Sequence, residues 1–442
     1  MTLPRLAAGL ALAAFAAAPL LADGHREGHD DRFDLSRPDA PSLAAQGPHP
    51  IGVRTFEFVN PGVLDILNVE EGARPTYDRA LTVEVWHPAA EGTEPGTTYD
   101  VMIRDGVQFA KIRGAAARDA APAADGPYPL VIISHGYPGN RYLLGHLGEH
   151  LASHGYVVAS IDHLESTYDN RDKFGSTLVN RPVDQKFVID EMEALGAEDG
   201  ALAGVVDASN AAVVGYSMGA YGAVIFGGGG VAQVGIDHAW GAPDGTLAVH
   251  KAGSESHEAL IDERVKAIVA IAPWGWNTGF WDAESISGLR KPTLYIAGDA
   301  DDVSGYDPGV RTMWENSTDA DRWLLTFENA NHNAAAPMPA PTISWEPVET
   351  LDFVPFDHYA DAVWDSRRMN DILQHFAVAF LDRFVKQDAA MDPFLDLIPI
   401  AADGVVALNE ETGEPTDAHT YWEGFAPRTA LGLRFEKLSA GE

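Results

Sequence analysis

The sequence predicts an α/β fold in which a mostly parallel sheet carries helices on both faces. Short apolar segments alternate with longer segments of helical pattern through the centre of the chain. These apolar segments are continuous runs, which is typical of parallel strands that are buried on both faces. Apolar residues make up 46% of the chain and charged residues 21%, so there is enough material for a large core.

Each expected element follows from its own pattern. Residues 53–59 and 81–86 alternate between apolar and polar positions, and we expect them to form antiparallel edge strands that lead into the main sheet. The strands expected in the parallel sheet are residues 130–134, 157–161, 211–214, 265–272, 293–297 and 323–327. The helices expected between them are residues 143–154, residues 182–195 and a helix that starts at Met218.

The N-terminus has the pattern of a secretory signal peptide. Arg5 is the one positive charge in the first 22 residues, residues 6–21 are apolar, and Ala22 precedes a polar run. The apolar stretch is shorter than the about 20 residues that span a bilayer, and no second run of that length follows. We therefore expect a periplasmic or secreted protein without stable membrane insertion, with a non-cleaved anchor as the alternative.

The overall charge and the lack of cysteine exclude several classes of function. The chain has 65 acidic and 30 basic residues, a formal net charge of −35, so nucleic acid would be repelled. No cysteine is present, which excludes disulfides, thiol catalysis and lipid attachment through an N-terminal cysteine. The acidity is best explained as a solubility device.

The strongest chemical signal lies directly after the expected strand at 211–214. Residues 215–219 read Gly-Tyr-Ser-Met-Gly and lead into an apolar helix of small residues. Glycines flank the serine because a sharp strand-to-helix turn forces strained backbone angles and close approach. This is the nucleophile elbow of α/β hydrolases, and it makes Ser217 the candidate nucleophile.

A base and an acid for this serine follow in the order Ser, Asp, His. A serine hydroxyl needs a base within hydrogen-bond reach, and the base needs an acceptor that selects its tautomer. The strand at 293–297 leads to a cluster of acids that includes Asp301 and Asp302, and the strand at 323–327 leads to His332. We expect Asp301 to be the triad acid because Val303 and Ser304 follow it as the short continuation typical of this loop, with Asp302 as the second choice.

An oxyanion hole is expected on two loops. Residues 134–139 read Ser-His-Gly-Tyr-Pro-Gly and follow the strand at 130–134, where the second oxyanion loop of such folds lies. The backbone N–H groups of Tyr137 and Met218 are the expected donors.

Several of these segments together resemble a known group of esterases. The Ser-His-Gly at 134–136 and the Leu-Ala-Ser-His-Gly-Tyr-Val-Val at 151–158 resemble bacterial dienelactone-hydrolase-like esterases related to platelet-activating-factor acetylhydrolase. With the elbow, the Ala-Pro-Trp at 272–274, the acid loop and His332, the chain also resembles bacterial cutinases and polyester hydrolases, over most of residues 50–385.

The resemblance implies a serine ester hydrolase that uses no metal or organic cofactor and acts on a small-molecule or polymeric ester. It implies Ser217, Asp301 and His332 as the triad, and Tyr137 and Met218 as the oxyanion donors. Trp274 is implied as an aromatic wall of the substrate site, and Tyr216 stands where many polyester hydrolases have another aromatic. In the acetylhydrolase branch the acid follows the strand before Trp274, where this chain has no carboxylate, which favours the later acid loop.

The domain layout follows from these assignments. Residues 227–263 and 334–357 fit no repeat of the core, and both follow strand ends, so we expect them over the carboxyl edge of the sheet as a lid or pocket wall. The sequence does not predict an oligomeric state. The expected parts are a signal peptide at 1–22, a polar linker at 23–48, the catalytic domain at 49–388 and a C-terminal extension packed on it at 389–442.

Two other classes of function stay open at this stage. His146, Glu149 and His150 match the H-x-x-E-H pattern, in which two histidines share a helix face and ligate zinc, as in a metallopeptidase. The chain could also be a binding protein on a catalytically inactive hydrolase scaffold. The presence of all three triad residue types argues against the second alternative.

Overall fold

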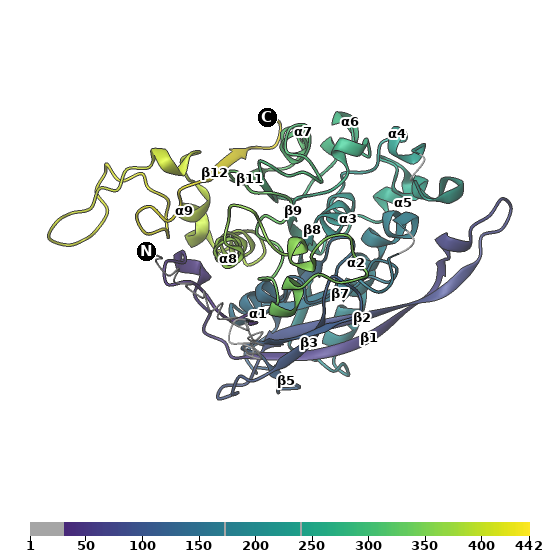
Figure 1. Ribbon diagram of the computed structural model, residues 1–442, viewed down its shortest axis with the longest axis horizontal. Coiled ribbons are helices and arrows are strands. Elements are labelled where there is room, and N and C mark those ends of the chain that lie inside the picture. The colour runs from purple at the N-terminus through teal and green to yellow at the C-terminus, as the bar shows by residue number, and fades with distance from the viewer. Residues whose placement is uncertain (1–30, 172–173, 239–240) are drawn as a thin grey trace, which may run out of the picture.

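The computed structural model describes residues 31–171, 174–238 and 241–442 (Figure 1). The expected signal peptide at 1–22 and the start of the expected linker lie outside these residues. The structure is built around a ten-stranded sheet with the order β12-β11-β10-β9-β8-β6-β7-β2-β1-β5, and strands β3 and β4 form a separate hairpin.

The strands are β1 (Ile51–Leu64), β2 (Thr76–Pro88), β3 (Thr98–Met102), β4 (Phe109–Arg113), β5 (Ala117–Arg118), β6 (Tyr128–Ser134), β7 (Val157–Asp162), β8 (Val206–Tyr216), β9 (Val265–Ile271), β10 (Thr293–Gly298), β11 (Arg322–Phe327) and β12 (Leu433–Leu438). The α-helices are α1 (Gly145–Ser153), α2 (Phe174–Gly196), α3 (Met218–Phe226), α4 (Gln233–Ile236), α5 (Glu255–Glu258), α6 (Ala283–Ser287), α7 (Val310–Asn316), α8 (Ser366–Phe384) and α9 (Asp392–Leu395). Several loops also contain short 3-10 helices.

The predicted mostly parallel sheet is confirmed. Strands β7, β6, β8, β9, β10 and β11 pair in parallel. Strand β2 pairs antiparallel with both β7 and β1, so the N-terminal strands lead into the sheet as expected. These two strands run side by side along one edge of the molecule and extend beyond it as a long ribbon (Figure 1).

Helices cover both faces of the sheet, which explains why its strands are continuous apolar runs. Neighbouring residues of a strand point to opposite faces. In β8, Val213 belongs to the core on the side of α2 and α3, and Val214 belongs to the core on the side of α1 and α8. Each strand residue therefore needs an apolar side chain. None of the helices in the described part of the chain combines the length and the apolar character needed to span a membrane.

The elements that have no counterpart in the prediction from sequence include the hairpin of β3 and β4, helix α8 and strand β12. Helix α8 is buried along much of its length, although polar side chains such as Asn370 and His375 interrupt its apolar face. Strand β12 pairs antiparallel with β11 and becomes the edge of the main sheet. The end of the C-terminal extension is thus part of the fold, whereas an exposed stretch before it forms an open loop (Figure 1).

The two long insertions are placed differently. The described residues of 227–263 lie against the helices behind the sheet edge, where His250 Nε2 is 2.7 Å from the carbonyl oxygen of Val179 in α2 and His257 Nε2 is 3.0 Å from that of Ile225 in α3. The segment 334–357 crosses the carboxyl edge of the sheet and brings Phe353 and Asp357 to the cavity described below. Of the described residues in these two insertions, only residues of 334–357 line the cavity.

Strand β12 offers a test of whether the C-terminal extension stabilises the domain. Phe435 is 2% exposed and stacks on Phe376 of α8 with ring centroids 4.9 Å apart. Phe435→Ala should lower the free energy of unfolding by about 3–5 kcal/mol, because it leaves a cavity in the core. Leu408→Ala, in the same extension but 47% exposed, should change it by less than about 0.5 kcal/mol. Urea denaturation of both variants checks this, and equal losses would contradict it.

Candidate active site

Ser217 lies in a strained turn between β8 and α3. Its backbone angles are φ 52° and ψ −111°, in a region that non-glycine residues rarely adopt. The flanking glycines are required by close packing: a Cβ on Gly215 would lie 2.4 Å from the nitrogen of Ala220, and one on Gly219 would lie 1.9 Å from the carbonyl oxygen of Ser134. The structure therefore has the strand, sharp turn and helix that the sequence motif predicts.

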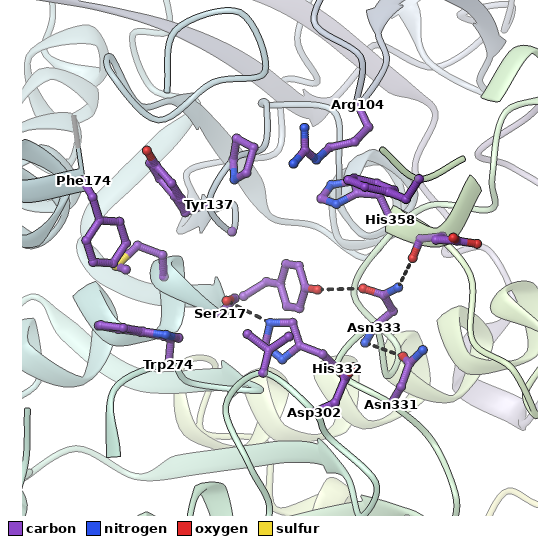
Figure 2. Close-up of a pocket in the computed structure, with 17 residues that line it drawn as sticks. Arg104, Tyr137, Phe174, Ser217, Trp274, Asp302, Asn331, His332, Asn333 and His358 are labelled. Carbon is purple, nitrogen blue, oxygen red and sulfur yellow. Dashed lines mark hydrogen bonds between the residues drawn. The ribbon is translucent and has the colours of Figure 1, made fainter. Parts of the chain in front are cut away.

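The imidazole of His332 joins Ser217 to Asp301. His332 Nε2 lies 2.9 Å from Ser217 Oγ (Figure 2). His332 Nδ1 lies 2.9 Å and 3.1 Å from the two carboxylate oxygens of Asp301. A carboxylate beside Nδ1 holds the proton on that nitrogen, so Nε2 is free to accept the proton of the serine hydroxyl. The three side chains come from the loops after β8, β10 and β11, at one edge of the sheet.

The structure brings Asp301 and not Asp302 to the imidazole. The side chain of Asp301 is fully buried, and its Oδ1 accepts N–H bonds from Val303 and Ser304, each of 2.8 Å. These bonds close a tight turn that aims the carboxylate at His332. The side chain of Asp302 is exposed and lines the cavity instead.

Ser217 and His332 line a cavity of about 550 Å³, which is within the size range of small-molecule binding sites. Figure 2 shows Phe174 and Trp274 on one side of Ser217, and Arg104 and His358 on the other. The residues that line it are Arg104, Gly136, Tyr137, Pro138, Phe174, Tyr216, Ser217, Met218, Trp274, Asp302, Val303, Asn331, His332, Asn333, Phe353, Asp357 and His358.

The two aromatic residues expected at the substrate site both line this cavity. Trp274 is 9% exposed and packs against Phe174 and Phe280, with ring centroids 5.2 Å and 5.0 Å away. Tyr216 lies beneath the imidazole of His332, with ring centroids 5.3 Å apart, and its hydroxyl donates to Asn333 Oδ1 at 3.0 Å. Burial raises the pKa of Tyr216, so its hydroxyl stays protonated and remains a donor. Trp274 thus forms a wall, and Tyr216 also supports His332.

Asparagines on both sides of His332 hold its loop, and the sequence analysis missed them. The amide of Asn333 donates to the carbonyl oxygens of Asp357 and Ala360 at 3.0 Å and 2.7 Å. Figure 2 also shows the bond between Asn333 and the hydroxyl of Tyr216. The backbone N–H of Asn331 donates to Asp361 at 2.6 Å. The Asn-His-Asn sequence is a signal that could have indicated such a loop, but the partners lie in a segment whose position only the fold determines.

The two expected oxyanion donors lie on adjacent walls of the cavity. Met218 is the first residue of α3, where the backbone N–H has no acceptor within the helix. Tyr137 follows β6, on the loop that packs against the elbow. The hydroxyl of Tyr137 donates to the carbonyl oxygen of Arg171.

A buried polar network that the sequence analysis missed lies beneath this oxyanion loop. The guanidinium of Arg181 donates to the carbonyl oxygen of His135 and lies 3.5 Å from that of Gly136. Ser134 Oγ lies 2.8 Å from His163 Nε2, and His163 Nδ1 lies 2.9 Å from Asp184. These contacts connect the loop to helix α2 through the side chains of Arg181 and Asp184.

The carboxylate of Asp184 is paired inside this network. Arg79 donates two bonds of 2.8 Å and 2.9 Å to Asp184. Although burial opposes ionisation, this arginine and His163 hold the pKa of Asp184 at about 2. Burial and the nearby Arg181 lower the pKa of His163 to about 3, so its imidazole is neutral. The network is thus a rigid, ionised support for the loop that carries Tyr137.

The H-x-x-E-H residues on α1 make structural contacts. His146 Nε2 lies 2.9 Å from the carbonyl oxygen of Ala336, and His150 Nε2 lies 3.0 Å from that of Leu43. Glu149 accepts the hydroxyl of Tyr99 at 2.6 Å, together with two backbone N–H groups. Within the described ranges, no three His, Cys, Asp or Glu side chains are arranged to hold a metal ion. The motif ties α1 to distant segments, which does not favour the metallopeptidase alternative.

Comparisons with known proteins agree with the fold and the motifs. A family model described as "PET hydrolase-like" matches residues 119–231. Cutinase 2 of Thermobifida cellulosilytica is 26% identical over 291 residues, which cover 66% of this chain and 80% of that cutinase. Platelet-activating factor acetylhydrolase of Bos taurus is 34% identical over 135 residues, 28% of this chain and 29% of that protein. A ferulic acid esterase from Streptomyces cinnamoneus has a similar structure, with a TM-score of 0.54 and 21% identity over 82% of this chain and 96% of the esterase.

The chain therefore has the α/β-hydrolase fold, as its elbow and sheet predicted. Within this superfamily it is similar to the PET hydrolase-like family and to the bacterial cutinases, and more locally to platelet-activating factor acetylhydrolase. The resemblance predicted from its sequence motifs is confirmed.

Proposed function

We propose that this protein is a serine ester hydrolase with Ser217 as nucleophile, His332 as base and Asp301 as the acid that orients the base. The observation that carries this proposal is the unbroken hydrogen-bond chain from Asp301 through His332 to Ser217 Oγ at the edge of an open cavity. Similarity to proteins named cutinases supports the ester as the bond that is cleaved.

The proposed mechanism is acyl transfer to water. His332 Nε2 takes the hydroxyl proton as Ser217 Oγ attacks the ester carbonyl, and the buried carboxylate of Asp301 stabilises the imidazolium that forms. His332 then returns the proton to the oxygen of the leaving alcohol. The alcohol departs, and the acyl group stays on Ser217 as the acyl-enzyme. A water molecule attacks the acyl group by the same route, and Ser217 is regenerated. These steps need no metal or organic cofactor.

The N–H groups of Tyr137 and Met218 are proposed to bind the oxyanion of each tetrahedral intermediate. Trp274 and Tyr216 are proposed to contact the ester. The cavity can take a small ester or the end of a polymer chain, and the relatives named cutinases favour an esterase of that type.

Replacing the nucleophile tests the proposal. Ser217→Ala should lower kcat for a short p-nitrophenyl ester by about 10³-fold or more, because no covalent intermediate can form. It should also abolish labelling by a fluorophosphonate probe. In a crystal structure of the wild-type adduct, the phosphoryl oxygen should lie within hydrogen-bond distance of both N–H groups named above. Equal ester turnover by the wild type and Ser217→Ala would instead support a catalytically inactive binding protein.

The choice between the two acids has its own test. Asp301→Asn should reduce kcat by about 10⁴-fold, since an amide beside Nδ1 selects the wrong tautomer of His332. Asp302→Asn is the matched control, because it removes the same charge one residue away and should cost less than about tenfold. Steady-state kinetics of the two variants decide the matter. The reverse ranking would reassign the acid and leave the serine mechanism intact.

We also propose that the protein is exported and loses its signal peptide. The support is the sequence of residues 1–22, with one positive charge, an apolar stretch and a small residue before a polar run. Mass spectrometry of the protein expressed with its full N-terminus in a bacterial host should show a periplasmic or secreted form that begins near residue 23. Recovery of the intact N-terminus in a membrane fraction would contradict this and support an uncleaved anchor.

A further inference from the structure

Arg104 brings a positive charge into the active-site cavity. It lies in the turn between β3 and β4, and its backbone N–H donates to the hydroxyl of Tyr359 at 3.0 Å. Its guanidinium packs over the ring of Phe353, 5.3 Å from the ring centroid. Figure 2 shows the guanidinium extending into the space between Tyr137 and His358, on the side of Ser217 opposite Trp274.

This guanidinium has no counter-charge among the described residues. Its Nη1 is buried and has no hydrogen-bond partner in the described part of the chain. The charged group that acts on it most strongly is another cation, Arg171, and burial together with that arginine lowers the pKa of Arg104. A buried cation without a partner is costly, so such a group is retained where a ligand supplies the opposite charge.

Several other buried or half-buried arginines of this acidic chain are paired with carboxylates. Arg79 contacts Asp184 at 2.8 Å, Arg141 contacts Asp162, and Arg311 contacts Glu436 at 2.8 Å. Within the described residues, Arg181 and Arg322 form no ion pair, but they donate to backbone carbonyl oxygens such as those of His135 and Trp314. Arg104 Nη1, in contrast, has no partner in the described part of the chain.

Two acids, Asp302 and Asp357, line the cavity. Asp302 lies on the far side of His332 in Figure 2, and neither acid is among the charged groups that act on Arg104.

We propose that Arg104 binds a carboxylate of the substrate, so that the preferred substrates are esters whose acyl part carries a second, free acid group. These are the half-esters of dicarboxylic acids. The proposal rests on the proposed ester hydrolysis at Ser217. The ester carbonyl lies at Ser217, the carboxylate pairs with the guanidinium, and the body of the acyl group spans the cavity between them. A guanidinium recognises a carboxylate through two parallel hydrogen bonds, which gives geometric selectivity as well as attraction.

Because the protein carries a large negative charge, a substrate with a carboxylate needs a positive group in the cavity in order to bind. A net charge of −35 repels an anion that approaches the protein. Without a cation in the cavity, a half-ester would be a poorer substrate than its neutral isostere. A preference for the anionic member of a matched pair therefore indicates a specific binding site for the carboxylate, because the negative surface of the protein would favour the neutral member.

The test uses two matched pairs of substrates, one aromatic and one aliphatic. Each pair joins a carboxylate to its neutral amide isostere: monomethyl terephthalate with methyl 4-carbamoylbenzoate, and monomethyl adipate with methyl adipamate. For at least one pair, wild-type kcat/KM should favour the carboxylate by about 10-fold to 100-fold at low salt, which is the selectivity expected from one charge-assisted pair. The preference should fall as the ionic strength rises.

Two arginine variants locate the effect. Arg104→Gln should reduce the carboxylate-to-amide ratio of kcat/KM to about one. Arg113→Gln is the control, because Arg113 is an exposed residue of β4 in the same hairpin and its loss changes the net charge equally. This control should retain the wild-type preference. A preference that survives in Arg104→Gln, or that is lost equally in Arg113→Gln, overturns the proposal, as does a wild-type enzyme with no preference in either pair.

A binding measurement separates this proposal from the proposed function. Isothermal titration of Ser217→Ala with 4-carbamoylbenzoate measures carboxylate binding without turnover, and adding Arg104→Gln should weaken it by about tenfold or more. If neither pair is hydrolysed but this difference in binding is found, the ester hydrolase proposal fails and the carboxylate site stands. If the pairs are hydrolysed and the binding difference is missing, the carboxylate site fails and the hydrolase stands.

Discussion

The close contact between the elbow and the end of strand β6 is the constraint on which the active site depends. Gly219 lies so near the carbonyl oxygen of Ser134 that no side chain fits between them, and Gly215 likewise leaves no room for a side chain against the backbone of α3. This contact places the start of α3 beside the loop that carries Tyr137. The positive φ of Ser217 is held from the other side by strand β9, where the Ser217 N–H donates to the carbonyl oxygen of Ile271 at 2.8 Å.

The same kind of close backbone packing joins the loops of the acid and the base. A Cβ on Gly298, at the end of β10, would lie 2.2 Å from the carbonyl oxygen of Ala330 in the loop after β11. The carboxylate of Asp299 accepts the N–H of Asn329 at 2.6 Å and so draws the two loops together. Since parallel strands end at one edge of the sheet, three loops distant in sequence meet there, and these contacts set their separation.

Polar side chains beneath the cavity hold the loops of the active site in place through hydrogen bonds. Arg181 holds the carbonyl groups of the loop that carries Tyr137, and Asn333 links Tyr216 to the segment after the second insertion. Such networks stabilise a site only when their members are paired. Arg104 departs from this rule, because its guanidinium faces the cavity without a carboxylate, and for that reason we assign its partner to the ligand.

The sequence by itself determined the class of fold, the elbow at Ser217 and the candidates His332 and Asp301, because these features depend on local patterns: continuous apolar strands, glycines around a strained serine, and polar residues after strand ends. It did not identify α8, since polar residues such as Asn370 interrupt the apolar face of that helix and find their partners only in the folded chain. Only the tertiary structure shows that Asp301, and not Asp302, lies beside His332. Adjacent residues of one loop point in different directions, and the turn that aims Asp301 at His332 is closed by backbone N–H groups. The tertiary structure was also needed to place Arg181, Asn333 and Arg104 at the site, because each of them acts through contacts with segments far away in sequence.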